Sequence, residues 1–152
     1  MENLLGEYKN IRELRAKAVQ YYAKQLQGTS VENATLKQMN ADKNGTIFFT
    51  GAGKREMKGT SAKIKKLLVV PQLPALIQSA TQITTSAATK ERHANETFYY
   101  LHTSGQIGEE PTPIVITLVK RNDKSIQYYN HILPLEEQRK NTPVSLGPES
   151  SK

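Results

Sequence analysis

The sequence contains no cysteine and no tryptophan, and aromatic residues make up only 7% of its 152 residues. The absence of cysteine excludes a disulfide framework, a zinc site built from thiolates and a cysteine nucleophile. No run of about 18 apolar residues occurs, which is the length that a membrane-spanning helix needs. The N-terminus, Met1-Glu2-Asn3, lacks the basic and apolar regions of a signal peptide. We therefore expect a cytoplasmic protein with no membrane partner.

Acidic residues are also scarce, with 14 Asp and Glu against 21 Lys and Arg, so the net charge is +7. The densest basic segment runs from Lys54 to Lys66 and contains one acidic residue, Glu56. Its basic residues are Lys54, Arg55, Lys58, Lys63, Lys65 and Lys66. Such a positive field attracts phosphate. We expect these side chains to bind a nucleic acid, chiefly RNA, or an acidic protein; a solvated helix face without a partner is the alternative.

Apolar residues near the N-terminus recur at helical spacing. From Ile11 to Tyr22 they are three or four residues apart, which predicts a helix over residues 6–27. Residues 29–46 are polar and contain few apolar residues, and Asn44-Gly45 predicts a turn. A short strand is predicted over residues 46–50.

The middle of the sequence predicts two more helices. One covers residues 61–69 and ends at Pro71. The next begins at Pro74, because proline suits the first turn of a helix. Residues 84–96 are rich in Thr, Ser, Ala and charge, and they predict a loop.

The last third of the sequence changes to the pattern of strands. The predicted strands cover residues 97–103, 114–120 and 125–133. Residues 121–124 predict the hairpin between the last two, and residues 136–140 predict a short helix. The Pro-, Gly- and Ser-rich residues 141–152 predict a disordered C-terminal tail.

This order of elements predicts an α+β fold, with N-terminal helices packed on one face of a C-terminal antiparallel β-meander. The length suits one domain, which we place over residues 1–140.

Several kinds of catalytic site are excluded by their spacing. A P-loop requires Gly-Lys followed by Ser or Thr, but Gly53-Lys54 is followed by Arg55. The acidic residues are scattered and the histidines lack the HxxxH and HExxH spacings, so we expect no metal and no cofactor.

Metal-free cleavage of RNA remains compatible with the residues present. It needs a base, an acid and a cation beside one phosphate. Alternation along a strand places His102 on one face with Tyr100, and His131 on one face with Tyr129. We take His131, His102 and Tyr129 as candidate catalytic residues; the alternative is that each is an ordinary sheet residue. His93, in the polar loop, is expected to have no role.

The segment from Leu73 to Ala80 resembles the "L-P-x-L-I-x-x-A" helix of a family found in phages and conjugative elements. The strand from Phe98 to His102 and the "Tyr-Tyr-x-His" strand from Tyr128 to His131 extend the likeness. Together, over roughly residues 8–138, they resemble the small domains of large polyvalent proteins of phages and mobile elements. Several such domains are grouped with the barnase–EndoU–colicin–RelE class of metal-independent nucleases.

The resemblance implies a nuclease-like α+β fold whose sheet carries the active face. His102 and His131 fall in the strands that carry the resemblance, and Lys54 and Lys58 in its basic segment. We therefore expect an endoribonuclease in which His131 is the base or acid, His102 is its partner, and Lys54 and Lys58 hold phosphate. The alternative is a non-catalytic module that binds nucleic acid or protein, such as a phage-encoded anti-defence inhibitor.

Overall fold

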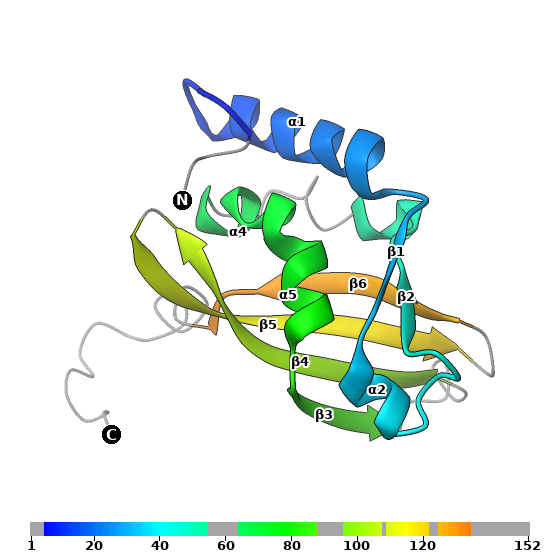
Figure 1. The fold of residues 1–152 in the computed structure, drawn as a ribbon. Helices are drawn as coiled ribbons and strands as arrows, with labels where there is room; N and C mark the ends of the chain where they lie inside the picture. The colour runs from blue at the N-terminus through cyan, green and yellow to red at the C-terminus, as the bar shows by residue number, and fades with distance from the viewer. Residues whose placement is uncertain (1–4, 55–63, 88–95, 108, 122–124, 135–152) are drawn as a thin grey trace.

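The structure is a computed structural model that describes residues 5–54, 64–87, 96–107, 109–121 and 125–134 (Figure 1). Within these residues, six strands form one sheet in the order β1-β2-β6-β5-β4-β3. The strands are β1 (Ser30–Glu32), β2 (Thr46–Phe48), β3 (Gln82–Ala87), β4 (Glu96–Ile107), β5 (Glu110–Arg121) and β6 (Ile126–Ile132). Neighbouring strands are antiparallel except β2 and β6, which run parallel.

The helices come from the N-terminal half of the chain. They are α1 (Ile11–Tyr21), α2 (Ala34–Gln38), α4 (Ile64–Leu68) and α5 (Leu73–Ser79), with short turns η1 (Tyr22–Leu26), η2 (Gly51–Lys54) and η3 (Val70–Gln72). Figure 1 shows α1, α4 and α5 over the same face of β4, β5 and β6. The predicted α+β architecture is therefore confirmed.

The first helix begins later than the sequence predicts. The side chain of Asn10 accepts a hydrogen bond from the backbone amide of Glu13 (2.9 Å), and the Glu13 carboxylate accepts one from the amide of Lys9 (2.6 Å). The Asn10 cap satisfies an amide that the first turn of a helix leaves unpaired, and the Glu13 carboxylate holds the preceding residue Lys9, so the helix starts at Ile11. The helix and the π-helical turn after it bury Leu14, Ala18, Tyr22 and Leu26.

Two segments for which the sequence predicts no helix or strand form secondary structure. Residues 29–46 contain β1 and α2, and the first part of residues 84–96 belongs to β3. β3 forms because six consecutive residues pair with β4, beginning with Gln82 opposite His102. Pairing with another strand outweighs the polar composition of this segment, whose Thr and Ile side chains suit an extended backbone.

The strands predicted over 97–103, 114–120 and 125–133 are present, and the first two are longer than expected. The predicted turn residues 122–124, the helix over 136–140 and the tail over 141–152 lie outside the described residues.

The core lies between the helices and the sheet. An aromatic cluster forms its centre, in which the ring centroids of Tyr22, Phe49 and Tyr128 lie 5.6–6.0 Å apart. α5 packs against both β4 and β1. The helical layer therefore closes one face of the sheet, and candidate functional side chains must be sought chiefly on the other.

Candidate functional site

The two faces of the sheet differ in what they present. On β4, Tyr99 and Leu101 are buried under the helices, whereas Tyr100 and His102 point to the opposite, open face. Residues that pair across neighbouring strands point to the same face of the sheet. The strand register therefore shows which residues of β3, β5 and β6 share the open face with Tyr100 and His102. His102 lies opposite Gln82 of β3 and Val115 of β5.

His131 does not lie on the open face. On β6, Tyr128 pairs with Leu118 and Asn130 with Thr117, although Thr117 and Leu118 are adjacent in β5. This register shift is a β-bulge, which inserts one extra residue, Tyr129, into the strand. Strict alternation would place Tyr129 and His131 on one face, but the bulge returns His131 to the face of Tyr128.

His131 is fully buried and both ring nitrogens have partners. Nε2 lies 2.8 Å from the backbone oxygen of Lys66, and Nδ1 lies 2.6 Å from the hydroxyl of Tyr128. A carbonyl only accepts, so Nε2 carries the proton and Nδ1 accepts from Tyr128. Burial lowers the pKa of His131 to about 4, which keeps the ring neutral near pH 7. The hydrogen bond from the ring to the carbonyl of Lys66 therefore connects β6 to α4.

The predicted pairing of His102 with His131 is therefore wrong. His102 is exposed on the open face, and His131 lies beneath the helices on the other side of the same sheet. The backbone of the sheet separates the two rings, so they cannot flank one phosphate.

His102 has hydroxyl groups beside it on the open face. Its Nε2 lies 3.0 Å from Oγ1 of Thr84 on β3. Two residues before His102 on the same strand face, the hydroxyl of Tyr100 lies 3.4 Å from Oγ of Ser86 on β3. A hollow of about 340 Å³ adjoins His102, and its lining includes Gln82 and Ser104. This region combines a titratable ring with several hydrogen-bonding groups.

Tyr129 lies apart from His102, next to Phe98. The ring centroids of Tyr129 and Phe98 are 6.1 Å apart and the rings are inclined by 62°, an edge-to-face contact. Tyr129 is 41% exposed. The open face thus has two parts: a histidine end at His102, and an aromatic end formed by Phe98 and Tyr129.

Comparison with known families assigns the chain. The family model of large polyvalent protein-associated domain 3 matches residues 9–129. The chain belongs to this family. No curated protein and no solved structure matches it. The polyvalent-protein part of the resemblance is therefore confirmed.

The basic segment of this polyvalent-protein domain is only partly described. Lys54 and Lys65 are partly exposed, and Arg55, Lys58 and Lys63 lie outside the described residues. Lys66 is only 7% exposed, because it lies on the inner side of α4 beside Leu67. The expectation that these six side chains bind nucleic acid stays a prediction, and Lys66 is the buried one among the three that the structure describes.

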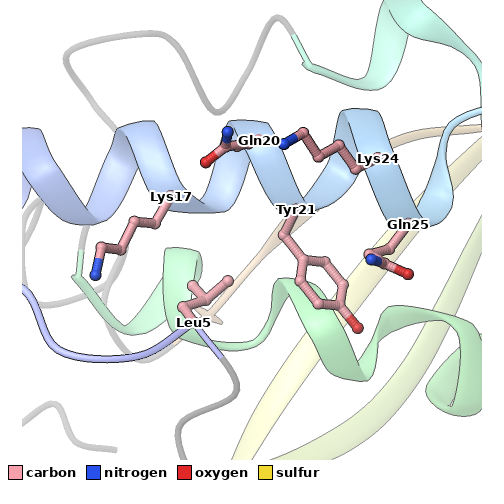
Figure 2. A pocket seen from close by; sticks show the side chains of 6 residues that line it. All are labelled: Leu5, Lys17, Gln20, Tyr21, Lys24 and Gln25. Carbon is pink, nitrogen blue, oxygen red and sulfur yellow. The ribbon is translucent and has the colours of Figure 1, made fainter.

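The polyvalent-protein domain also has a basic hollow that the sequence analysis did not single out. Figure 2 shows the side chains that line it, which come from the N-terminal segment, α1 and η1. Its volume is about 290 Å³. Its lining consists of Leu5, Lys17, Gln20, Tyr21, Lys24 and Gln25. Lys17 donates to the backbone oxygen of Glu7, and in Figure 2 Lys24 extends toward Gln20. The helical layer therefore carries part of the positive charge.

Two further features bear on the kind of site. In the described ranges, no cluster of three or more His, Asp or Glu side chains is placed to hold a metal ion. In the same ranges, no helix has the length and apolar character needed to cross a membrane.

Proposed function

We propose that this polyvalent-protein domain cleaves single-stranded RNA without a metal ion, and that the reaction takes place on the open face of the sheet. The observation that carries the proposal is the exposed ring of His102, held 3.0 Å from the Thr84 hydroxyl in a hollow of the sheet face. The resemblance to metal-independent nucleases, which place their active groups on a sheet, supports the same location.

The proposed reaction transfers two protons. The unprotonated ring of His102 accepts the proton of a ribose 2′-hydroxyl, and the 2′-oxygen forms a bond to the adjacent phosphorus. The bond from phosphorus to the 5′-oxygen breaks, and that oxygen takes up a proton from a solvent water molecule. The backbone of Tyr100 lies roughly 7 Å along the strand from that of His102 on the same face, and its hydroxyl, 3.4 Å from Oγ of Ser86, is a hydrogen-bond donor for the phosphate. The products carry a 2′,3′-cyclic phosphate and a 5′-hydroxyl.

The test uses labelled single-stranded RNA in EDTA. We expect the wild-type protein to leave cyclic phosphate ends and His102→Gln to be slower by about 100-fold or more, the usual contribution of a general base. His93→Gln, the same change at a histidine expected to have no role, is the matched control. Equal rates for the wild type and His102→Gln would remove His102 from the reaction.

A second function, binding without cleavage, is favoured by one observation. No Lys or Arg is among the described residues that line the hollow at His102. Arg121, at the end of β5, forms an ion pair with Glu96 at 2.6 Å. A cation to stabilise the charged phosphorane is therefore missing from this set. This alternative predicts a salt-dependent gel shift with no turnover, which Lys54→Glu with Lys65→Glu would weaken.

A further inference from the structure

The aromatic end of the open face is built from three neighbouring strands. Phe98 comes from β4 and Tyr129 from β6, and Val119 of β5 lies between them, paired with Phe98 and Gln127. Val119 is only 1% exposed although its register places it on the open face. The two rings, with centroids 6.1 Å apart, thus meet above the central strand of the three.

The bulge in β6 sets the position of Tyr129. Tyr129 is the extra residue, because Tyr128 pairs with Leu118 and Asn130 pairs with Thr117. A bulge bends its strand and re-aims the side chain at that point. The result is a phenol ring that is 41% exposed and supported at its edge by Phe98. A ring held in this way offers a rigid apolar surface at little cost in side-chain entropy.

We infer that Tyr129 is a stacking platform for an unpaired base of the RNA strand, separate from the reacting phosphate at His102. The inference rests on the proposed function and adds a second point of contact to it. Bases stack on exposed aromatic rings regardless of sequence. The net charge of +7 favours a polyanionic strand as the partner of this domain, and the exposed ring gives such a strand a stacking surface on this face. Tyr129 is then a binding residue and not a catalytic one, in contrast to its predicted role.

The distance between His102 and Tyr129 determines the length of RNA needed to use both points. β5 lies between β4 and β6, so the two residues are roughly 10 Å apart across the sheet at the spacing of neighbouring strands. Tyr129 is also displaced along the strands, because it lies at Thr117 and Leu118 of β5 whereas His102 pairs with Val115. One sugar–phosphate step, all that a dinucleotide has, does not bridge this distance. A dinucleotide therefore reaches His102 without reaching Tyr129, whereas a longer strand reaches both.

The experiment measures cleavage of a dinucleotide and of an octanucleotide by the same variants. For Tyr129→Ala we expect KM to rise by about 5- to 100-fold with the octanucleotide, the usual range for loss of one stacked base, and kcat to stay unchanged. With the dinucleotide neither constant changes. Tyr129→Phe, which keeps the ring, retains the wild-type KM. Ile64→Ala, which truncates an exposed side chain (43%) on α4 in the helical layer, is the matched control.

A 2′-deoxy octanucleotide, which lacks the attacking hydroxyl, separates this inference from the proposed function. If the wild type cleaves RNA but Tyr129→Ala affects both lengths equally or neither, the platform is wrong and the nuclease proposal stands. If no RNA is cleaved but Tyr129→Ala weakens binding of the 2′-deoxy strand, the platform stands and cleavage is wrong. Neither cleavage nor binding overturns both.

Discussion

At the scale of single residues, buried polar side chains hold the fold together at two places. One is Asn33, which is 1% exposed and caps α2 by accepting from the amide of Leu36 at 2.8 Å. Its Nδ2 donates to the backbone oxygens of Ile77 (2.7 Å) and Ala80 (2.8 Å) at the end of α5. The side chain thus joins two segments more than 40 residues apart in the chain.

We expect Asn33→Asp to lower the free energy of unfolding by about 2–4 kcal/mol, since the new carboxylate oxygen would face two carbonyl oxygens that it cannot satisfy. Urea denaturation at neutral pH measures the change. Asn44→Asp, the same substitution at an exposed position, is the control and should change stability little. A similar stability for both variants would mean that the Asn33 contacts contribute nothing.

The second place is His131, whose pKa is about 4 in the folded protein against an ordinary 6.5. Between pH 4 and pH 6.5 the unfolded chain binds more protons than the folded one. The contribution of His131 to the free energy of unfolding is therefore fully present above pH 6.5 and is lost as the pH drops toward 4. The loss amounts to roughly 3 kcal/mol, because each pKa unit corresponds to about 1.4 kcal/mol. Urea denaturation from pH 7.5 to 4 measures it.

His131→Leu should remove most of this pH dependence while lowering stability at pH 7, since Tyr128 and the Lys66 carbonyl lose their partner. His102→Gln, which changes an exposed ring, should keep the pH dependence of the wild type. An unchanged slope in His131→Leu would show that other groups cause the acid destabilisation.

At the scale of elements, the connection from β1 through α2 to β2 depends on one glycine. Gly45 has φ +68°, and a Cβ there would overlap the backbone oxygen of Asn33. The amide of Asn33 donates to the Gly45 carbonyl at 2.8 Å, so the two backbones cannot separate without losing this bond. Close approach and left-handed backbone both require glycine here.

We expect Gly45→Ala to lower the free energy of unfolding by about 3 kcal/mol or more, which combines left-handed strain of about 1–2 kcal/mol with the steric overlap. Gly28→Ala is the matched control, because Gly28 also has a positive φ (+88°) but its Cβ would meet nothing within 4 Å. Thermal unfolding of the two variants separates strain from overlap. Equal losses would show that the α2 segment simply moves aside.

At the scale of the whole molecule, the helices and the open face lie on opposite sides of the sheet (Figure 1). Lys17 and Lys24 belong to the helical layer, whereas His102 and Tyr129 belong to the open face. The two sides therefore offer different surfaces to a polyanion, one through charge and the other through stacking and hydrogen bonds.

Reversing Lys17 and Lys24 together to Glu distinguishes these surfaces. If RNA lies on the open face, the slope of log affinity against log salt stays unchanged, since that slope counts cations in contact with phosphate. A slope smaller by about 2 would place the strand on the helical layer, because each phosphate-contacting Lys contributes about one unit. Fluorescence anisotropy over a salt series gives the slope.

Much of the architecture follows from local sequence. The α+β class, the helix at Pro74 and the strands over 97–103, 114–120 and 125–133 were all predictable, because apolar periodicity records which side of an element is buried. The same local reasoning failed at residues 84–87. Their composition is that of a loop, and only pairing with β4 makes them a strand.

The sequence by itself determined the helices α1, α4 and α5, the strands β2, β4, β5 and β6, the order of these elements and the family likeness, because each of these rests on neighbouring residues. Only the tertiary structure decided which side chains share a face. One extra residue in β6 moves His131 from the open face into the core, and the bulge that does so depends on pairing with β5. The partner of the buried ring, the carbonyl of Lys66, is 65 residues away. The alternation of side chains along one strand does not reveal a bulge, because a bulge depends on pairing with a strand from a distant part of the chain.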